Sequence, residues 1–176
     1  MILFYPGHLS SDPKAIQALH TALKDQPIRL LSDEVLNHPL KDLTDPSAQF
    51  TCSLEDVHQE CPFLLFSGCE LNQVSTFQNA IEQAGLPIRA MAIETANNRE
   101  MHLQDLMAEV EREAEYFAKR DELADLLNNV DPNRLRVDQD YFKCAMLAAD
   151  LLRQEELSEK MLDTALAVMH SFDKEK

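Results

Sequence analysis

Short apolar runs and helix-like apolar spacing alternate twice within the first 97 residues. The runs Ile2–Tyr5 and Phe63–Phe66 have the length and composition of buried strands. Each is followed by a polar stretch, by apolar residues at helical spacing, and then by a second short apolar run. The pattern therefore predicts two β-α-β units, over residues 1–32 and 62–95.

The two predicted units agree in detail. Apolar residues recur at i, i+3 and i+7 in both helices, as Ile16, Leu19 and Leu23 and as Val74, Phe77 and Ile81. The tripeptide Pro-Ile-Arg follows each helix, at 27–29 and at 87–89. Asp12 before Pro13 is a typical helix start, and Gly85 is a typical helix end. We interpret the units as a duplication, and the alternative is a chance similarity between two ordinary units.

Residues 33–60 separate the units and are rich in acidic side chains. We expect a surface connection, with helical turns near Leu40–Leu43 and Leu54–His58. Its length is unusual for a compact domain, which suggests a covering flap or a partly mobile segment.

The pattern changes after Asn97, because residues 98–176 contain no glycine and only one proline, Pro132. Asn97 followed by Glu100 resembles a capping box and predicts a long amphipathic helix that ends near Asn129. Two further helices are predicted by apolar positions at helical spacing: Tyr141, Ala145, Ala148 and Leu152, then Leu157, Met161, Ala165, Val168 and Phe172. These segments predict a helical bundle or arm.

The predicted fold class is α+β. Residues 1–97 form a duplicated β-α-β domain with a four-stranded ferredoxin-like sheet, and residues 98–176 form a C-terminal helical bundle. The alternative is a parallel α/β sheet with the same helical extension.

Charge and composition narrow the classes of partner. The chain has 176 residues, with 31 acidic and 16 basic side chains and a formal net charge of −15. This balance argues against nucleic acid and against an anionic membrane surface as partners. No apolar run is long enough to cross a membrane, and the first residues lack the pattern of a secretory signal. We therefore expect a cytoplasmic protein whose four cysteines are reduced thiols.

Residues from Cys61 to about Glu113 resemble a bacterial family known only as domain of unknown function 3783. The resemblance rests on the strand Phe63–Phe66 followed by Ser-Gly, on the Ala-Gly-Leu-Pro ending at 84–87, and on Glu-Thr-Ala-Asn at 94–97 before an acidic amphipathic helix. Two features depart from the family pattern: Ala96 replaces a proline, and the aromatic residue often found after the asparagine is missing. The family has no established activity, so the resemblance implies a fold and no reaction.

Two loops are candidates for binding a small ligand. Gly7 and His8 follow the first predicted strand, and Gly68 and Cys69 occupy the equivalent place in the second unit. Glu70, Thr95 and Asn97 complete the candidate residues. In a parallel sheet with strands 1 and 3 adjacent, both loops would border one crevice, whereas in a ferredoxin-like sheet they lie at opposite ends. Ordinary turn residues are the simpler interpretation.

The sequence assigns no catalytic residue, metal or cofactor. The three glycines are too far apart for a phosphate-binding loop, a dinucleotide-binding turn or a G-x-S-x-G turn. Cys52, His58, Cys61 and Cys69 lie close in sequence but form no C-x-x-C pair, and we interpret them as packed or surface residues. Cys69 has no orienting motif that would pair it with a histidine as a nucleophile. The sequence therefore favours a protein that is not an enzyme.

The methionine- and alanine-rich C-terminal helices fit either a packed core or an adaptable docking surface. We predict a non-enzymatic cytoplasmic interaction or adaptor module, with a protein partner or with self-association through these helices. The alternative is a small-ligand or metal-binding domain that uses the loops after strands 1 and 3.

Overall fold

A computed structural model describes residues 1–24, 26–155 and 157–173. Contacts divide the chain into two compact units, Met1–Arg112 and Glu113–Lys176, which we call the sheet unit and the helical unit. The division falls within the long helix α4 (Leu103–Asn128).

The sheet unit is built on four short strands, β1 (Ile2–Tyr5), β2 (Ile28–Leu30), β3 (Phe63–Phe66) and β4 (Ala90–Ile93). Their order across the sheet is β2-β1-β3-β4. The pairs β1–β2 and β3–β4 are parallel, and β1 and β3 are antiparallel, with Ile2 opposite Phe66 and Tyr5 opposite Phe63. The structure is therefore a mixed α+β fold with a four-stranded mixed sheet, as the predicted fold class requires in outline.

The ferredoxin-like strand order is not confirmed. A ferredoxin-like sheet places another strand between the two parallel strands of each β-α-β unit. Here β1 and β2 are direct neighbours, as are β3 and β4. The alternative of a parallel sheet is not observed either, because β1 and β3 run antiparallel. All four residues of β1 and all four of β3 are buried, which explains why these two strands occupy the centre.

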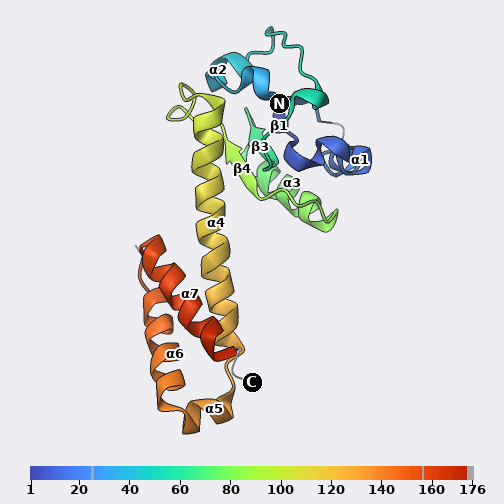
Figure 1. The fold of residues 1–176 in the computed structure, drawn as a ribbon. Coiled ribbons are helices and arrows are strands. Elements are labelled where there is room, and N and C mark those ends of the chain that lie inside the picture. Colours follow the sequence, from blue (N-terminus) through green and yellow to red (C-terminus); the bar gives the residue numbers. More distant parts are fainter. Residues whose placement is uncertain (25, 156, 174–176) are drawn as a thin grey trace. The chain divides into compact units, whose positions relative to one another are not determined.

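Helices α1 (Pro13–Ala22) and α3 (Leu71–Gln83) cover one face of the sheet (Figure 1). Their predicted apolar rows pack on Ile2, Phe4, Leu64 and Phe66. The predicted cap at Asp12 is confirmed, because its side chain accepts hydrogen bonds from the Lys14 and Ala15 amides. The capping carboxylate and the φ value that proline fixes explain why α1 starts at this point.

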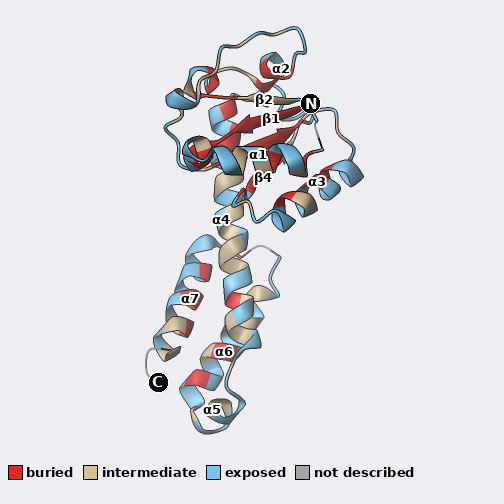
Figure 2. Cartoon of the chain, turned by 90° about the vertical axis from the view of Figure 1, so that its right-hand side faces the viewer, coloured by how far each residue is buried: buried red, intermediate tan, exposed pale blue. Residues whose placement is uncertain are grey.

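The connection between the repeats covers the other face of the sheet. It contains two 3-10 turns, Asp33–Val35 and Leu54–Asp56, and the short helix α2 (Leu40–Leu43). Leu40 and Leu43 are fully buried against Leu3, Tyr5, Phe63 and Leu65, together with the first turns of α4. Figure 2 shows the strands buried between these layers. The connection is therefore a structural layer of the sheet unit.

Helix α4 begins at Leu103, six residues after Asn97, where the sequence predicts its cap. The Asn98 side chain instead closes a turn after β4, accepting from the Thr95 amide at 2.8 Å and donating to the Ile93 carbonyl at 2.9 Å. The first α4 amides donate to the connection: Leu103 to the His38 carbonyl and Gln104 to the Leu36 carbonyl, both at 3.0 Å. A distant segment therefore supplies the acceptors that a helix start needs.

The helical unit contains the end of α4 together with α5 (Pro132–Val137), α6 (Gln139–Leu152) and α7 (Glu159–Asp173). Its core includes Leu123, Tyr141, Ala145, Ala148, Leu162, Ala165, Leu166 and Met169. Arg134 links three of the helices, because its guanidinium lies 4.8 Å from the Tyr141 ring centroid and donates to the Phe172 carbonyl at 2.6 Å. These contacts make the unit a small packed bundle.

Candidate functional site

An open apolar groove of about 350 Å³ runs between α6 and α7 in the helical unit. We call it the α6–α7 groove. Its lining residues are Cys144, Leu147, Ala148, Leu151, Lys160, Met161, Thr164, Ala165 and Val168. Apart from Lys160 and Thr164, all of these side chains are apolar or a thiol. The groove is therefore a candidate docking surface.

The groove exists because α6 carries apolar residues on more of its circumference than its core contacts use. Tyr141, Ala145 and Ala148 face the bundle core and are buried. One step round the helix, Cys144, Leu147 and Leu151 form a second apolar row at helical spacing. A helix that packs through one stripe ordinarily carries polar residues in such a row. This second row forms one wall of the groove.

Large apolar side chains at the groove are exposed to solvent. Leu147 is 64% exposed and Met161 is 44% exposed. Phe142 and Met146, also on α6, are 47% and 48% exposed. Scattered apolar residues are normal on a protein surface, but a contiguous apolar groove indicates an interaction site.

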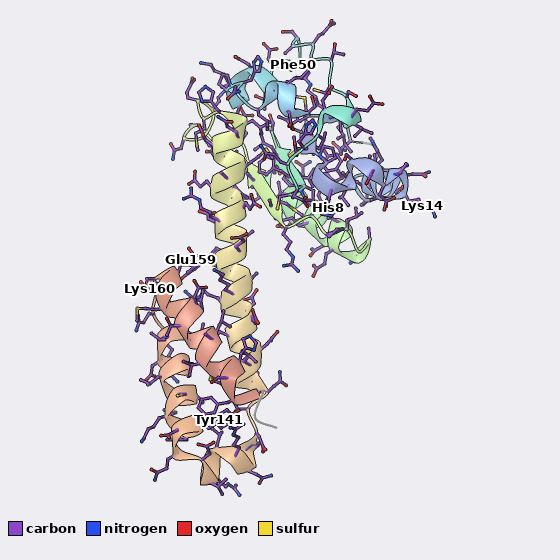
Figure 3. The ribbon with its side chains drawn as sticks, in the orientation of Figure 1. His8, Lys14, Phe50, Tyr141, Glu159 and Lys160 are labelled. Carbon is purple, nitrogen blue, oxygen red and sulfur yellow. The ribbon has the colours of Figure 1, made fainter. Side chains whose placement is uncertain are left out.

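Charged side chains of both signs lie at each end of the groove: Glu159 shares the first turn of α7 with Lys160, and Lys143 lies beside Asp140 on α6. Lys160, labelled in Figure 3, lies in the first turn of α7 and forms no ion pair with any residue that the structure describes. Asp140 lies in the first turn of α6, four residues before Cys144, and does not itself line the groove. Because α6 and α7 run antiparallel (Figure 1), these first turns lie at opposite ends of the groove. The Asp140 carboxylate is 85% exposed and lies 3.7 Å from the Lys143 ammonium.

The candidate loop residues of the sheet unit fall into two separate groups. Gly7 and His8 follow β1, whereas Gly68, Cys69 and Glu70 follow β3. Since β1 and β3 are antiparallel, these loops lie at opposite ends of the sheet. The structure therefore does not bring His8 and Cys69 to a common crevice.

At the carboxyl end of β1, the candidate residues hold the backbone together. Both the backbone amide and ring Nδ1 of His8 lie 2.9 Å from the Glu60 carbonyl oxygen, which accepts a hydrogen bond from each. Gly7 has a φ of +54° and is so close to the segment 60–62 that a Cβ atom would lie 2.5 Å from backbone atoms. This close approach requires glycine at position 7.

A hydrogen-bond cluster that the sequence did not reveal joins Tyr5, Asp33 and His58 at the same end of the sheet. The buried Tyr5 hydroxyl donates to Asp33 Oδ1 and accepts from the Gln59 amide at 3.0 Å. Asp33 Oδ2 lies 2.9 Å from His58 Nδ1. Burial and the Asp33 carboxylate raise the pKa of Tyr5 to about 12. Burial alone would raise the pKa of Asp33, but hydrogen bonds from Tyr5 and His58 lower it overall.

This cluster ties both ends of the 33–60 connection to β1. Tyr5 and Asp33 are 28 positions apart in sequence, and Asp33 and His58 are 25 apart, so no short sequence motif contains the cluster. The Tyr5 hydroxyl and the Asp33 carboxylate are engaged with other protein groups. The arrangement therefore explains how the connection is held on the sheet.

At the carboxyl ends of β3 and β4, the candidate residues form caps and turns. Glu70 caps α3 in a capping box with Gln73. The Cys69 thiol lies 3.7 Å from the Ser67 carbonyl oxygen, and Thr95 Oγ1 accepts from the Asn98 amide at 3.3 Å. Asn97 is exposed. Gly68 has a φ of +65°, with open space where a Cβ atom would lie.

Glu94 is the most enclosed acidic group at this end, with its side chain 13% exposed. Its carboxylate accepts from Ser67 Oγ at 2.6 Å and from Thr44 Oγ1 at 3.0 Å. Arg99 Nε lies 3.4 Å from the same carboxylate. The sequence did not single out Glu94, because Thr44 and Ser67 come from other segments. These contacts join α2 to the ends of β3 and β4.

The cysteine and histidine residues that lie close in sequence are separated in the structure. Cys52, within the connection, packs against the core on that face of the sheet, and the Cys61 thiol donates to Glu111 Oε1 at 2.8 Å. Cys69 lies on the other side of the sheet, with the residues that pack against α1 and α3. Within residues 1–24, 26–155 and 157–173, no three His, Cys, Asp or Glu side chains are grouped as metal ligands would be.

Residues 62–117 match the model of a family described as domain of unknown function, DUF3783. The match confirms the resemblance predicted from residues 61–113 and covers about a third of the chain. Comparisons with curated proteins and with solved structures gave no match. Among the helices of the described residues, none combines the length and the apolar character that a membrane crossing needs.

Proposed function

We propose that this chain is a cytoplasmic protein-interaction module that binds its partner through the α6–α7 groove. The observation that carries the proposal is an apolar groove, open to solvent, with Leu147 64% exposed on its wall. Burying such a side chain in a partner removes apolar surface from water, which is the main driving force of protein association.

The distribution of exposed apolar residues supports the helical unit as the binding part. Of the eight large apolar side chains that are exposed among the described residues, six belong to the helical unit: Phe117, Val137, Phe142, Met146, Leu147 and Met161. The sheet unit, although longer, contributes only Leu54 and Leu71. The acidic composition makes a nucleic-acid partner unsuitable, so we propose a protein partner.

A photo-crosslinking amino acid at a single position of the full-length chain tests this function in its native cells. At position 147 we expect discrete covalent adducts, and mass spectrometry of the joined peptides then identifies the protein in the groove. Position 71 is the matched control, because Leu71 is 75% exposed and does not line the groove. Equal adduct yields from positions 147 and 71 would contradict the proposal.

A further inference from the structure

The four-stranded sheet ends at β4, and a groove lies beside this edge strand. We infer that the free edge of β4 binds an extended segment of another protein, which joins the sheet as a further strand parallel to β4. The surface belongs to the sheet unit and is additional to the α6–α7 groove of the proposed function.

The register of β3 and β4 identifies the backbone groups that are free. The Glu94 amide donates to the Phe66 carbonyl at 2.9 Å, and alternate residues of a parallel ladder direct their N–H and C=O groups to the same neighbour. Ala92 therefore faces β3, whereas Met91 and Ile93 direct their backbone groups to the open edge. The Met91 amide, the Met91 carbonyl and the Ile93 amide form no hydrogen bond with any residue that the structure describes.

The fourth outward group, the Ile93 carbonyl, selects the direction of the added strand because the Asn98 side-chain amide already donates to it at 2.9 Å. A parallel strand pairs with the other three groups, since one of its residues lies between the Met91 carbonyl and the Ile93 amide. An antiparallel strand would place one of its own N–H groups against the occupied carbonyl. A two-fold-related copy of β4 would run antiparallel, so the geometry favours a different protein over a second copy.

β4 also lacks the features that ordinarily protect an exposed edge. Native edge strands are commonly protected by a charged residue, a proline or a bulge. Ala90–Ile93 contains no charged residue and no proline, and it pairs with β3 in regular register. By contrast β2, at the other edge of the sheet, has Arg29 as its middle residue. The β4 edge is therefore open to another strand.

The groove beside this edge, of about 420 Å³, receives a side chain of the added strand. Its lining residues are Gln78, Ile81, Glu82, Leu86, Pro87, Ile88, Arg89 and Met91. Side chains alternate between the faces of a strand, and Met91 packs on the face that α3 covers. The residue opposite Met91 therefore points into the groove, where Ile81 and Ile88 offer apolar contacts. Main-chain hydrogen bonds hold such a segment, and the groove selects an apolar side chain at this position.

Peptide binding to the purified full-length chain tests the inference. The probe is a displayed library of peptides of about ten residues in which apolar and polar positions alternate, and the selected binders are then synthesised. A saturating peptide should slow hydrogen exchange of the Met91 and Ile93 amides by about tenfold or more. The Ala92 amide, which faces β3, should change little.

Two substitutions separate the contributions of the edge and of the groove. Met91→Pro removes an outward N–H group from an edge strand and should weaken binding by about tenfold or more. Gln78→Trp fills the groove from an exposed position of α3 and should weaken binding by about as much. Asn79→Trp is the matched control, because Asn79 is exposed on α3 but does not line the groove. Circular dichroism confirms that each variant is folded, and Gln78→Trp decides the test if Met91→Pro does not fold.

A nitroxide at the amino end of the peptide tests the direction of the strand, since a parallel strand should broaden the Arg89 amide signal more than that of Glu94. The inference is overturned if no peptide binds, if bound peptide leaves exchange at Met91 and Ile93 unchanged, if Gln78→Trp binds as Asn79→Trp does, or if the broadening is reversed. Protection of Met91 that rises with the concentration of the chain alone would identify a second copy and overturn the choice of partner. Crosslinking at position 147 is a separate measurement, so each of these failures leaves the proposed function standing.

Discussion

Replacement of Gly7 by alanine tests how the first strand is connected to the rest of the sheet unit. Gly7 has a φ of +54°, and a Cβ atom there would lie 2.5 Å from the Cys61 carbonyl carbon, the Glu60 carbonyl oxygen and the Pro62 nitrogen. These are backbone atoms, so no side chain can rotate away. The hydrogen bond from the His8 amide to the same Glu60 oxygen, at 2.9 Å, holds the two segments at this separation.

The expected magnitude combines two costs. A left-handed conformation costs a residue with a Cβ atom about 1–2 kcal/mol. Overpacking of a closely packed site costs about 1–3 kcal/mol more. We therefore expect Gly7→Ala to lower the free energy of unfolding of the sheet unit by about 2–5 kcal/mol. Gly85→Ala is the matched control, because Gly85 has a φ of +68° and nothing within 4 Å of its Cβ position.

Hydrogen exchange of the β1 and β3 amides measures this effect, since it reports opening of the sheet unit independently of the helical unit. Gly85→Ala should show the conformational cost alone, about 1–2 kcal/mol. The difference between the two variants isolates the close approach at Gly7. If Gly7→Ala reduces protection no more than Gly85→Ala does, the reasoning about this contact is refuted.

Three further substitutions test other parts of the fold. Asp33→Asn should lower the free energy of unfolding by about 1–3 kcal/mol at pH 7. Because the folded state lowers the pKa of Asp33, this contribution is complete above the unfolded pKa near 4 and is lost as pH falls through the folded pKa. A difference in urea midpoint between wild type and variant that stays constant down to pH 2 would contradict this prediction. Leu162→Ala, at a fully buried position, should cost about 2–5 kcal/mol in thermal unfolding, whereas Met146→Ala, at a 48% exposed position, should cost far less. Arg134→Lys should lower the free energy of unfolding by about 1–2 kcal/mol, because lysine cannot both stack on Tyr141 and form the hydrogen bonds that the guanidinium makes to two groups. The control Arg136→Lys, at an exposed position, should leave the thermal unfolding temperature unchanged.

Local patterns predicted the elements of the sheet unit well, because local chemistry determines them. The runs at Ile2–Tyr5 and Phe63–Phe66 became the two central strands, and the predicted cap at Asp12 is present. The same patterns could not establish strand order. An apolar run indicates that a strand is buried on both faces, but it does not say which way the next strand runs. The antiparallel pairing of β1 and β3 depends on where the 33–60 connection delivers the chain.

The start of α4 shows how a distant contact overrides a local signal. Asn97 and Glu100 match the spacing of a capping box, but the helix begins at Leu103, where the His38 and Leu36 carbonyls accept its first amides. The groove differs in this respect, because its signal was present locally. Cys144, Leu147 and Leu151 follow helical spacing beside the predicted core row, so an apolar surface wider than one stripe could have been recognised from the sequence alone.

The arrangement of the sheet unit explains why we place the proposed interaction surface in the helical unit. One face of the sheet is covered by α1 and α3, and the other by the connection and the first turns of α4. At one end of the sheet His8 and Asp33 bind other parts of the chain, and at the opposite end Glu94 does the same. In the helical unit, by contrast, Leu147 and Met161 line an open groove without a comparable covering layer among the described residues. Since exposed apolar surface is the part of a folded chain that gains most from a partner, binding through the groove accounts for a feature that the packing of the single chain does not explain.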